Sequence, residues 1–411
     1  MPNFICKSLN LRSLPVSYNE SEFIAIANEL RDGKKTNTSL VLTKIKDEKF
    51  LIIIKKRPNQ SYLIKGDKIL KPTNISILQR GLSDFKAAFC EQIITNAINQ
   101  KAKPENLAFN INEDELSIIA KHFSAQNLAQ ANFSAYENFN KFCLEIGFGS
   151  GAHLLFRAQS EPRTLFAGIE IHRPSLIKVS KLASQMGLKN LLLLNVDARS
   201  ALSLLPSNTI DKIFVHFPVP WNKSPSRRVL NKQVAKICDR VLKNGGVLEL
   251  RSDDREFFDA SLACFLDLEN AKIKIYKNRS LEIISKYEKR WLSEHKDIYD
   301  MLYFCTKTSQ DLKSQDKDFE FKEFCARKFL ENFKNKTFKF DDYFVHLEGV
   351  FLLLGENNFI LKASFGGFSA PVTSYIIAQN NQAHYLKTPL KTEHNLKAHE
   401  IMQQILTCEI L

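Results

Sequence analysis

The chain of 411 residues lacks any uninterrupted apolar run of about 18 residues, the length that a helix needs to cross a bilayer. Its first residues, MPNFICKSLNLR, also lack the long apolar core of a secretory signal. These absences argue against a membrane-spanning protein and against a secreted one. We therefore expect a soluble, cytoplasmic protein without a membrane partner.

The sequence has no C-x-x-C motif and no histidines clustered beside its cysteines. The eight cysteines are scattered, mostly within apolar segments, and we interpret them as reduced core residues. His394 and His399 come nearest to a metal-ligand pair, but no third ligand stands beside them. A solvated helix face is therefore the favoured interpretation, and no metal site is expected.

The length allows two or three domains, and no internal repeat is evident. The net charge of +13 is unevenly distributed, with 19 basic against 13 acidic side chains in 1–125, 27 against 19 in 126–310 and 12 against 13 in 311–411. A basic protein suits a polyanionic partner, above all nucleic acid. A lysine-rich solvated surface explains the charge equally well, so charge alone leaves both interpretations open.

Between about residues 140 and 306, apolar strand-like runs alternate with amphipathic helical segments, as is typical of a doubly wound α/β sheet. The first strand is expected to run into residues 144–151. The later strands are expected at 166–171, 191–197, 210–217, 247–253, 273–277 and 298–305, and the helices near 152–159, 174–186, 231–242 and 254–266.

The flanks have another character. Residues 39–70 alternate as short strands and residues 82–123 look helical, whereas the tail begins with a helix that places Phe321, Cys325, Phe329 and Phe333 on one face and continues as strands. We predict an N-terminal extension over 1–125, a central domain over 126–310 and a C-terminal α+β extension over 311–411. Because each flank is small for a core of its own, residues 311–411 are hypothesised to co-fold with residues 1–80 as a strand-rich accessory region.

Residues 144–151 read LEIGFGSG, a strand followed by three alternating glycines. Gly147, Gly149 and Gly151 let the backbone turn sharply and approach a ligand closely. Glu145 would repel a pyrophosphate, and the third glycine comes one residue too early for a dinucleotide motif. A phosphate-free, zwitterionic ligand such as S-adenosylmethionine fits better, with a merely connecting turn as the alternative.

Acidic residues follow the later strands, at the edge of the sheet where ligands bind in doubly wound folds. Glu170 can accept hydrogen bonds from two ribose hydroxyls, and Asp197 from an adenine amino group. Asp253 ends the fifth predicted strand. Each acid alone could equally cap a helix, but together, in this order, they favour a ligand site.

The loop after the fourth predicted strand reads FPVPWNKSPSRR. Two prolines stiffen it, Trp221 can stack on a base, and Lys223, Arg227 and Arg228 can contact phosphates. A basic, aromatic loop of this kind suggests a nucleic-acid substrate. The alternative is a rigid loop with a packed Trp221, which composition alone slightly favours.

In their order, the segments LEIGFGSG, GIEIH, VDA, FPVPWNK with a following RR, LRSDD and ISKYEKR resemble the motifs of the bacterial tRNA (guanine-N7)-methyltransferases, over about residues 140–306. The resemblance implies a Rossmann-like class I methyltransferase fold, mostly parallel with an antiparallel last strand, with S-adenosylmethionine as cofactor and tRNA as partner. It assigns cofactor binding to Glu145, Glu170 and Asp197, with Phe217 and Val219 in the same pocket. It assigns substrate contacts to Lys223, Asp253, Ser285, Lys286, Tyr287 and Glu288, and nothing to the flanks.

One position departs from the family pattern. The family's loop normally reads F-P-D-P-W, with an aspartate assigned to catalysis, whereas this chain has Val219 there. Guanine N7 presents a lone pair and carries no proton, so the attack needs orientation but no base. We expect Asp253 to be the catalytic residue, because it can accept from guanine N1–H and the 2-amino group and can stabilise the positive charge that develops on the purine.

We therefore predict a monomeric enzyme that methylates N7 of a variable-loop guanine in tRNA. One rival is a methyltransferase acting on another RNA base position, although its usual N/D-P-P-aromatic loop is missing here. The other is a module that binds cofactor and tRNA but has lost catalysis through Val219.

Overall fold

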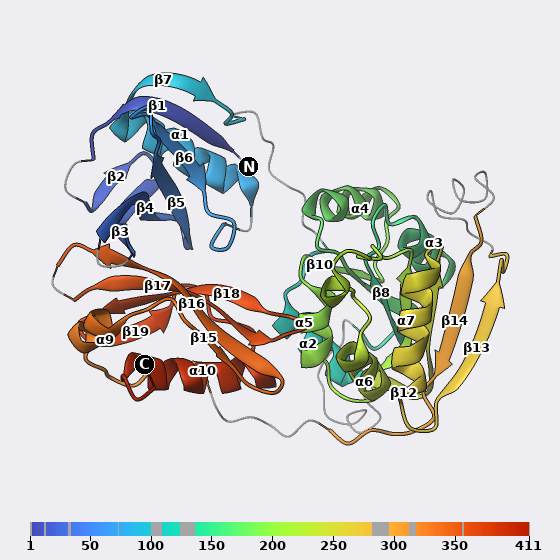
Figure 1. Cartoon of the computed structure of the whole chain (residues 1–411). Coiled ribbons are helices and arrows are strands. Elements are labelled where there is room, and N and C mark those ends of the chain that lie inside the picture. Colours follow the sequence, from blue (N-terminus) through green and yellow to red (C-terminus); the bar gives the residue numbers. More distant parts are fainter. Residues whose placement is uncertain are drawn as a thin grey trace. The chain divides into compact units, whose positions relative to one another are not determined.

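The computed structural model describes residues 2–11, 14–31, 34–72, 74–99, 109–123, 136–281, 296–311, 318–355 and 357–410. The chain divides into two compact units (Figure 1). Unit 1 contains residues 1–105 and 316–411, and unit 2 contains residues 106–315. Helix α2 (Glu113–His122), which the sequence placed in the N-terminal extension, belongs to unit 2, because Leu116, Ile119 and Ala120 pack into its core.

The described part of unit 2 is built on a seven-stranded sheet with the strand order β10-β9-β8-β11-β12-β14-β13. The strands are β8 (Lys141–Ile146), β9 (Thr164–Ile169), β10 (Leu191–Leu194), β11 (Ile210–His216), β12 (Leu242–Ser252), β13 (Lys272–Lys277) and β14 (Tyr299–Phe304). Strands β8 to β12 pair in parallel, and β14 is antiparallel to β12 and to β13. The predicted Rossmann-like sheet with an antiparallel last strand is confirmed.

Helices cover both faces of this sheet (Figure 1). Helices α3 (Ala152–Ser160) and α4 (Arg173–Gln185) pack on one face, whereas α2, α5 (Ala198–Leu204), α6 (Lys232–Val241) and α7 (Arg255–Leu266) pack on the other. Asp197, Asn231 and Asp254 cap α5, α6 and α7 by accepting hydrogen bonds from backbone N–H groups. The strand order reverses between β8 and β11, and in such sheets ligands bind at that point, beyond the carboxyl ends of the strands.

Unit 1 contains a twelve-stranded antiparallel sheet, counted over its described residues. Its main order is β19-β18-β17-β16-β3-β4-β5-β6-β1-β7, with β2 on β3 and β15 on β16. The strands are β1 (Asn3–Leu9), β2 (Val16–Tyr18), β3 (Ser21–Arg31), β4 (Lys34–Ile45), β5 (Glu48–Lys56), β6 (Tyr62–Gly66), β7 (Cys90–Asn96), β15 (Thr337–Lys339), β16 (Tyr343–Leu353), β17 (Phe359–Gly367), β18 (Val372–Gln379) and β19 (Gln382–Tyr385).

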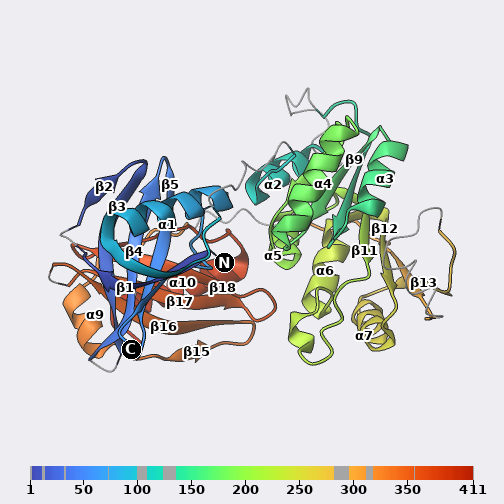
Figure 2. The same cartoon turned by 90° about the horizontal axis from the view of Figure 1, so that it is seen from above.

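The two flanks meet where β3 pairs with β16, so they form one sheet. Helix α1 (Ile75–Phe89) covers the N-terminal strands, and α9 (Ala326–Asn332) and α10 (Glu393–Leu406) cover the C-terminal ones (Figures 1 and 2). The remaining faces of the two halves share one apolar cluster, to which β4 contributes Leu40 and Leu42, and β18 contributes Tyr375 and Ile377. Unit 1 is thus held together by contacts between residues about 300 positions apart.

Two expectations for the flanks were wrong. Residues 90–96, predicted as helix, form strand β7, because Cys90 ends α1 in an extended conformation and the segment pairs with β1. Helix α9 begins only at Ala326, so of the four residues placed on one helical face only Phe329 lies in a helix. Phe321 instead packs against Tyr385.

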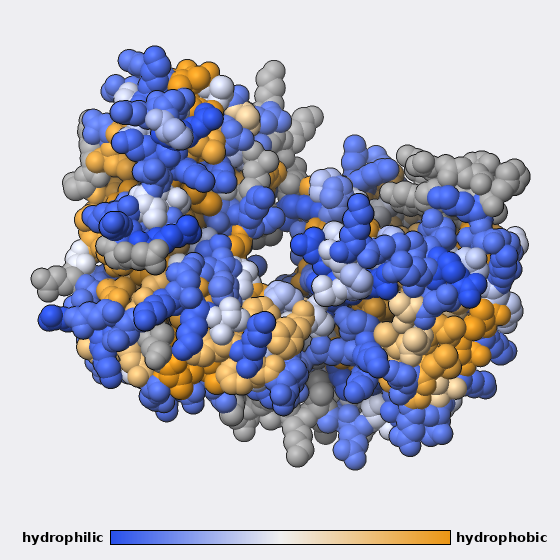
Figure 3. All heavy atoms as spheres, in the orientation of Figure 1, coloured by the Kyte–Doolittle hydropathy of each residue, from blue (hydrophilic) through white to orange (hydrophobic). Residues whose placement is uncertain are grey.

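The face of the molecule shown in Figure 3 is mostly hydrophilic, with apolar residues gathered over α7, where Leu266 is 58% exposed. Within the described part of the chain, no helix is both long enough and apolar enough to cross a membrane.

Candidate active site

The glycine turn follows β8 directly. Gly147, Gly149 and Gly151 all have positive φ values, of 71°, 51° and 75°. A Cβ on Gly151 would come within 2.3 Å of Val179 Cγ2, so this glycine allows the turn to pack against α4. A Cβ on Gly147 or Gly149 would meet no atom closer than 3.9 Å. These two glycines therefore leave open space beside the backbone, as close approach of a ligand requires.

Glu170 follows β9 and lies beside this turn. The residue is 8% exposed. Its Oε2 accepts a hydrogen bond from Gly149 N at 2.9 Å, and its Oε1 accepts one from His172 N at 2.8 Å. A carboxylate has about four acceptor positions, so each oxygen keeps room for a further donor such as a ribose hydroxyl.

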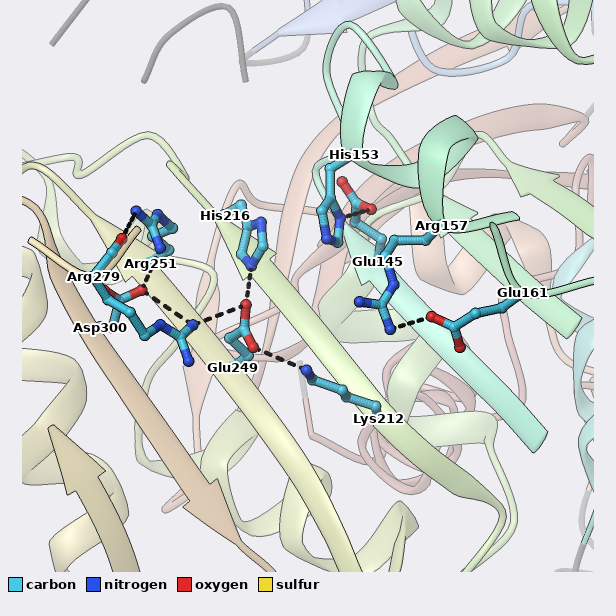
Figure 4. A network of polar contacts seen from close by, with 10 residues as sticks. All are labelled: Glu145, His153, Arg157, Glu161, Lys212, His216, Glu249, Arg251, Arg279 and Asp300. Carbon is cyan, nitrogen blue, oxygen red and sulfur yellow. Dashed lines mark hydrogen bonds and ion pairs between the residues drawn. The ribbon is translucent and has the colours of Figure 1, made fainter. Parts of the chain in front are cut away.

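Glu145 lies in β8, two residues before the turn, and is buried. Its Oε2 lies 2.7 Å from Nδ1 of His153 in α3. Figure 4 shows the two side chains pointing toward each other. The sequence assigned Glu145 to the cofactor, and the structure adds that one of its oxygens pairs with an imidazole. The cofactor contact stays a prediction.

A second carboxylate–imidazole pair stands beside the first. His216 Nε2, at the end of β11, lies 2.9 Å from Oε1 of Glu249 in β12, and the rings of His153 and His216 are 4.5 Å apart. Burial lowers the pKa of His216 despite its bond to Glu249. Lys212 Nζ lies 2.9 Å from the other oxygen of Glu249, Oε2. Burial alone would raise the pKa of Glu249, but the contacts with His216 and Lys212 have the larger effect, so the pKa is lowered overall.

The charged cluster continues across the sheet face toward β14 (Figure 4). Arg251 Nη1 donates to Asp300 Oδ1 at 3.0 Å, and both residues are almost completely buried. Arg279 Nη2 lies 3.4 Å from Glu249 Oε1 and 3.5 Å from Asp300 Oδ1. Arginines and carboxylates alternate along this face, so the buried charges offset one another.

Asp197 lies three residues beyond β10 and forms the N-cap of α5. Its carboxylate accepts from the backbone N of Arg199 at 2.9 Å and from the Arg199 guanidinium at 2.5 to 3.2 Å. The side chain is still 32% exposed. Its role toward an adenine amino group stays a prediction.

The loop after β11 has an unusual backbone. Phe217 and Trp221 have φ values of 49° and 48°, in the left-handed region that side chains disfavour. Val219 is 62% exposed and Trp221 is 40% exposed, and the Arg227 guanidinium lies 5.1 Å above the indole ring. Lys223 and Arg227 are both exposed, so both can reach an RNA phosphate.

Arg228 differs from what its neighbours suggest. We predicted an RNA contact, but the residue is 7% exposed, and its guanidinium donates to Pro220 O, Asn222 Oδ1 and Glu256 Oε1. These contacts commit Nε and Nη2 of the guanidinium to the protein itself. The predicted RNA contact of Arg228 stays a prediction.

Asp253 follows the last residue of β12 and is partly exposed. No hydrogen bond or ion pair joins its carboxylate to any residue that the structure describes, whereas the next residue, Asp254, caps α7. Asp253 thus presents an uncommitted acid at the same sheet edge as the glycine turn. Ser285, Lys286, Tyr287 and Glu288 lie outside the described residues.

Sequence reasoning missed the buried polar cluster. A signal was present, because Glu249, Arg251 and Asp300 interrupt apolar strands, and a charge inside such a run requires a partner. The partners themselves lie on other strands, and His153 and His216 are unremarkable in the sequence.

The sequence predicts no metal site. No cluster of three or more metal-ligating side chains occurs among the described residues. His394 lies 3.1 Å from Asp342, and His399 Nδ1 lies 3.2 Å from the Tyr385 hydroxyl. Cys325 is exposed, which corrects its assignment to the core.

Comparison with known proteins gives consistent matches. A family model described as a putative methyltransferase matches residues 139–301. A "tRNA (guanine-N(7)-)-methyltransferase" of Campylobacter fetus is 39% identical over 99% of this chain and 99% of its own, and proteins of the same name from Campylobacter jejuni and Helicobacter pylori are 39% and 34% identical. These two cover 99% of this chain and 98% and 99% of their own. This chain belongs to the tRNA (guanine-N7)-methyltransferase family.

The similarity covers 99% of this chain, so it includes the residues of unit 1 as well as those of unit 2. Among solved structures, one titled "Structure of an Antibiotic Related Methyltransferase" is 16% identical, with a TM-score of 0.34, covering 48% of this chain and 95% of its own.

Proposed function

We propose that this protein transfers a methyl group from S-adenosylmethionine to N7 of a variable-loop guanine in tRNA. The observation that carries the proposal is the Glu170 carboxylate, which backbone N–H groups of Gly149 and His172 fix beside the open glycine turn. A fixed carboxylate that retains acceptor positions suits the two hydroxyls of a ribose. Membership of the family supplies the reaction type and the substrate class.

The residues present fit S-adenosylmethionine. Gly147 and Gly149 leave space for close approach, Glu170 can hold the ribose, and Glu145 can accept from the ammonium group through Oε1, since Oε2 pairs with His153. Asp197, Phe217 and Val219 complete the proposed pocket, with no phosphate-binding group required. When bound, the cofactor supplies an electrophilic methyl group.

The chain's own residues then orient the guanine. Asp253 is the uncommitted acid at the sheet edge, and it can accept from N1–H and from the 2-amino group, a pattern that adenine lacks. Its negative charge favours the positive charge that develops on the purine. Because N7 carries no proton, Val219 removes no group that the attack requires.

The exposed residues of the loop hold the RNA. Lys223 and Arg227 can neutralise phosphates. The Arg227 guanidinium covers one face of the Trp221 indole, and a base can stack on the other face. Ser285, Lys286, Tyr287 and Glu288 remain proposed substrate contacts on the strength of the sequence motif alone.

The test is methyl transfer by the purified full-length chain. The protein is incubated with unmodified bulk tRNA and S-adenosylmethionine labelled in the methyl group, and the RNA is digested to nucleosides. The label should appear in 7-methylguanosine. Label in another nucleoside would favour a different target base, and binding of both ligands without transfer would indicate a catalytically impaired module.

A further inference from the structure

A buried arginine, Arg228, links the loop after β11 to the start of α7, which follows β12. We infer that Arg228 is a positioning residue, which sets the loop of residues 217–223 relative to Asp253, and that it does not bind RNA. The inference rests on the proposed function, in which Asp253 orients the guanine. Two adjacent arginines thus have different roles: Arg227, which is exposed, contacts RNA, and Arg228, which is buried, positions the loop.

The Arg228 guanidinium reaches both loops at once. Its Nε donates to Pro220 O at 2.8 Å, and its Nη2 donates to Asn222 Oδ1 at 3.0 Å, so both bonds end on the loop after β11. The same Nη2 donates to Glu256 Oε1 at 2.5 Å, in the first turn of α7, three residues after Asp253. Its carbon Cζ also lies 5.9 Å from the ring of Phe257.

A second connection runs in parallel with the first. Asn222 Nδ2 donates to Asp254 Oδ2 at 2.9 Å, and Asp254 Oδ1 accepts from Phe257 N at 2.7 Å. The residue next to Asp253 therefore holds the loop through one carboxylate oxygen and the helix through the other. Asp253 itself is placed between this junction and the end of β12.

The backbone conformation of the loop 217–223 must be stabilised by contacts with other segments. Phe217 and Trp221 hold left-handed backbone conformations that residues other than glycine disfavour, so the surrounding structure must maintain them. Val219 brings no polar group to the site. The contacts that the loop offers through Trp221 and Lys223 therefore depend on its position, which Arg228 fixes together with the Asn222–Asp254 bond.

The chemistry of the contacts requires arginine. One planar guanidinium bonds three acceptors that lie on two separate chain segments, and it can do so because its five donors have fixed directions. A lysine keeps the charge but offers one rotatable ammonium group. At an RNA phosphate, by contrast, lysine and arginine both serve as a positive charge.

The test compares Arg228→Lys with Arg227→Gln in the full-length protein, with Lys236→Gln on the exposed side of α6 as a control for lost surface charge. For each variant, three quantities are measured: the single-turnover rate constant at saturating tRNA and cofactor, the Kd for tRNA, and the dependence of that Kd on salt. Thermal unfolding and the Kd for S-adenosylmethionine report on the fold.

We expect Arg228→Lys to lower the saturating rate constant about tenfold or more. The salt slope of tRNA binding should stay unchanged, because no phosphate contact is removed, although the Kd rises to the extent that Trp221 and Lys223 are displaced with the loop. Arg227→Gln should weaken tRNA binding and reduce the salt slope by about one. Lys236→Gln should change neither. The inference is overturned if Arg228→Lys retains the full rate, or if it reduces the salt slope as Arg227→Gln does.

A second variant covers the case in which Arg228→Lys does not fold. Glu256 is 62% exposed in its side chain, so Glu256→Gln removes the charged acceptor at the other end of the connection without opening the core. It should lower the rate constant a few-fold while leaving the salt slope of tRNA binding unchanged, and its effect should not add to that of Arg228→Lys. A full rate in Glu256→Gln would contradict the inference. Failure of the unmodified protein to form 7-methylguanosine would instead contradict the proposed function.

Discussion

The sheets of the two units place their polar side chains differently. In unit 2, acids stand at the carboxyl ends of parallel strands, and a charged cluster around Glu249 lies on one sheet face. In unit 1, the strands are antiparallel and apolar side chains cover both faces, with Tyr375 and Asp67 forming a buried polar pair between the two flanks. Parallel strands bring their carboxyl ends to one edge, whereas antiparallel strands alternate, so only the sheet of unit 2 can gather strand-end residues into one site.

The two units also differ in whether they hold the proposed site residues. All the residues proposed for cofactor and guanine lie in unit 2, yet relatives share the full length of the chain. Substitutions at the proposed site residues of unit 2 should therefore act on methyl transfer, and substitutions in the core of unit 1 on stability.

The largest effect is expected at Asp253. Asp253→Ala should lower methyl transfer by about three orders of magnitude, because both the orientation of guanine and the stabilisation of its charge are lost. The Kd for S-adenosylmethionine should stay nearly unchanged. Rates are measured in single turnover, with Asp259→Ala on the exposed side of α7 as the matched control. Full activity of Asp253→Ala would remove this residue from the mechanism.

A smaller effect is expected at Glu170. In Glu170→Gln an amide NH₂ group would face the N–H of Gly149 or His172, so the acceptor for the ribose would be displaced. The loss of a hydrogen bond to a charged group corresponds to about 10- to 100-fold weaker cofactor binding, measured by calorimetry. Glu161→Gln, in the half-buried pair with Arg157, is the control. Unchanged affinity in Glu170→Gln would contradict the proposed ribose site.

The buried imidazole of His216 makes the stability of unit 2 dependent on pH. Burial lowers the pKa of His216, so below the ordinary value of 6.5 the unfolded chain takes up a proton that the folded protein does not. Stability should therefore fall as the pH drops below about 6.5, by up to about 1.4 kcal/mol per pH unit for this group. His216→Gln should remove that part of the slope. Denaturant unfolding at several pH values measures it, and equal slopes in both proteins would contradict the prediction.

The smallest effect is expected in unit 1. Tyr375→Phe leaves Asp67 Oδ1 without the donor that lies 3.0 Å away, which should cost about 1 to 3 kcal/mol of unfolding free energy. Methyl transfer by the folded protein should be unaffected. Tyr18→Phe, at an exposed position, is the control. A loss of activity at unchanged stability would show that unit 1 does more than support the fold.

The sequence predicted best where local rules decide the structure. Pro174 marked the start of α4, and the spacing of Gly147, Gly149 and Gly151 indicated a turn that the structure shows with three positive φ values. It failed where partners lie far apart in the chain. Strand β7 pairs with β1, and although Ile93, Ile94 and Thr95 are β-branched, the segment follows α1 directly, so no break separates it from the helical pattern.

Within the site, the sequence did not reveal which charged side chains are buried. A sequence shows that Arg227 and Arg228 are both cations, but only the fold shows that one faces solvent and the other is enclosed by loop carbonyls and Glu256. In the same way, Glu145 could be placed near a ligand, whereas its bond to His153 depends on how α3 returns over β8.

The central claim is that methyl transfer requires orientation of the guanine but no general base. It is tested most directly by the pH dependence of single-turnover formation of 7-methylguanosine in tRNA. Because guanine N7 carries no proton and Val219 supplies no base, the rate constant at saturating tRNA and cofactor should vary by less than about twofold between pH values of about 6.5 and 8. A rate constant that rises about tenfold per pH unit would demonstrate an essential base and contradict this mechanism.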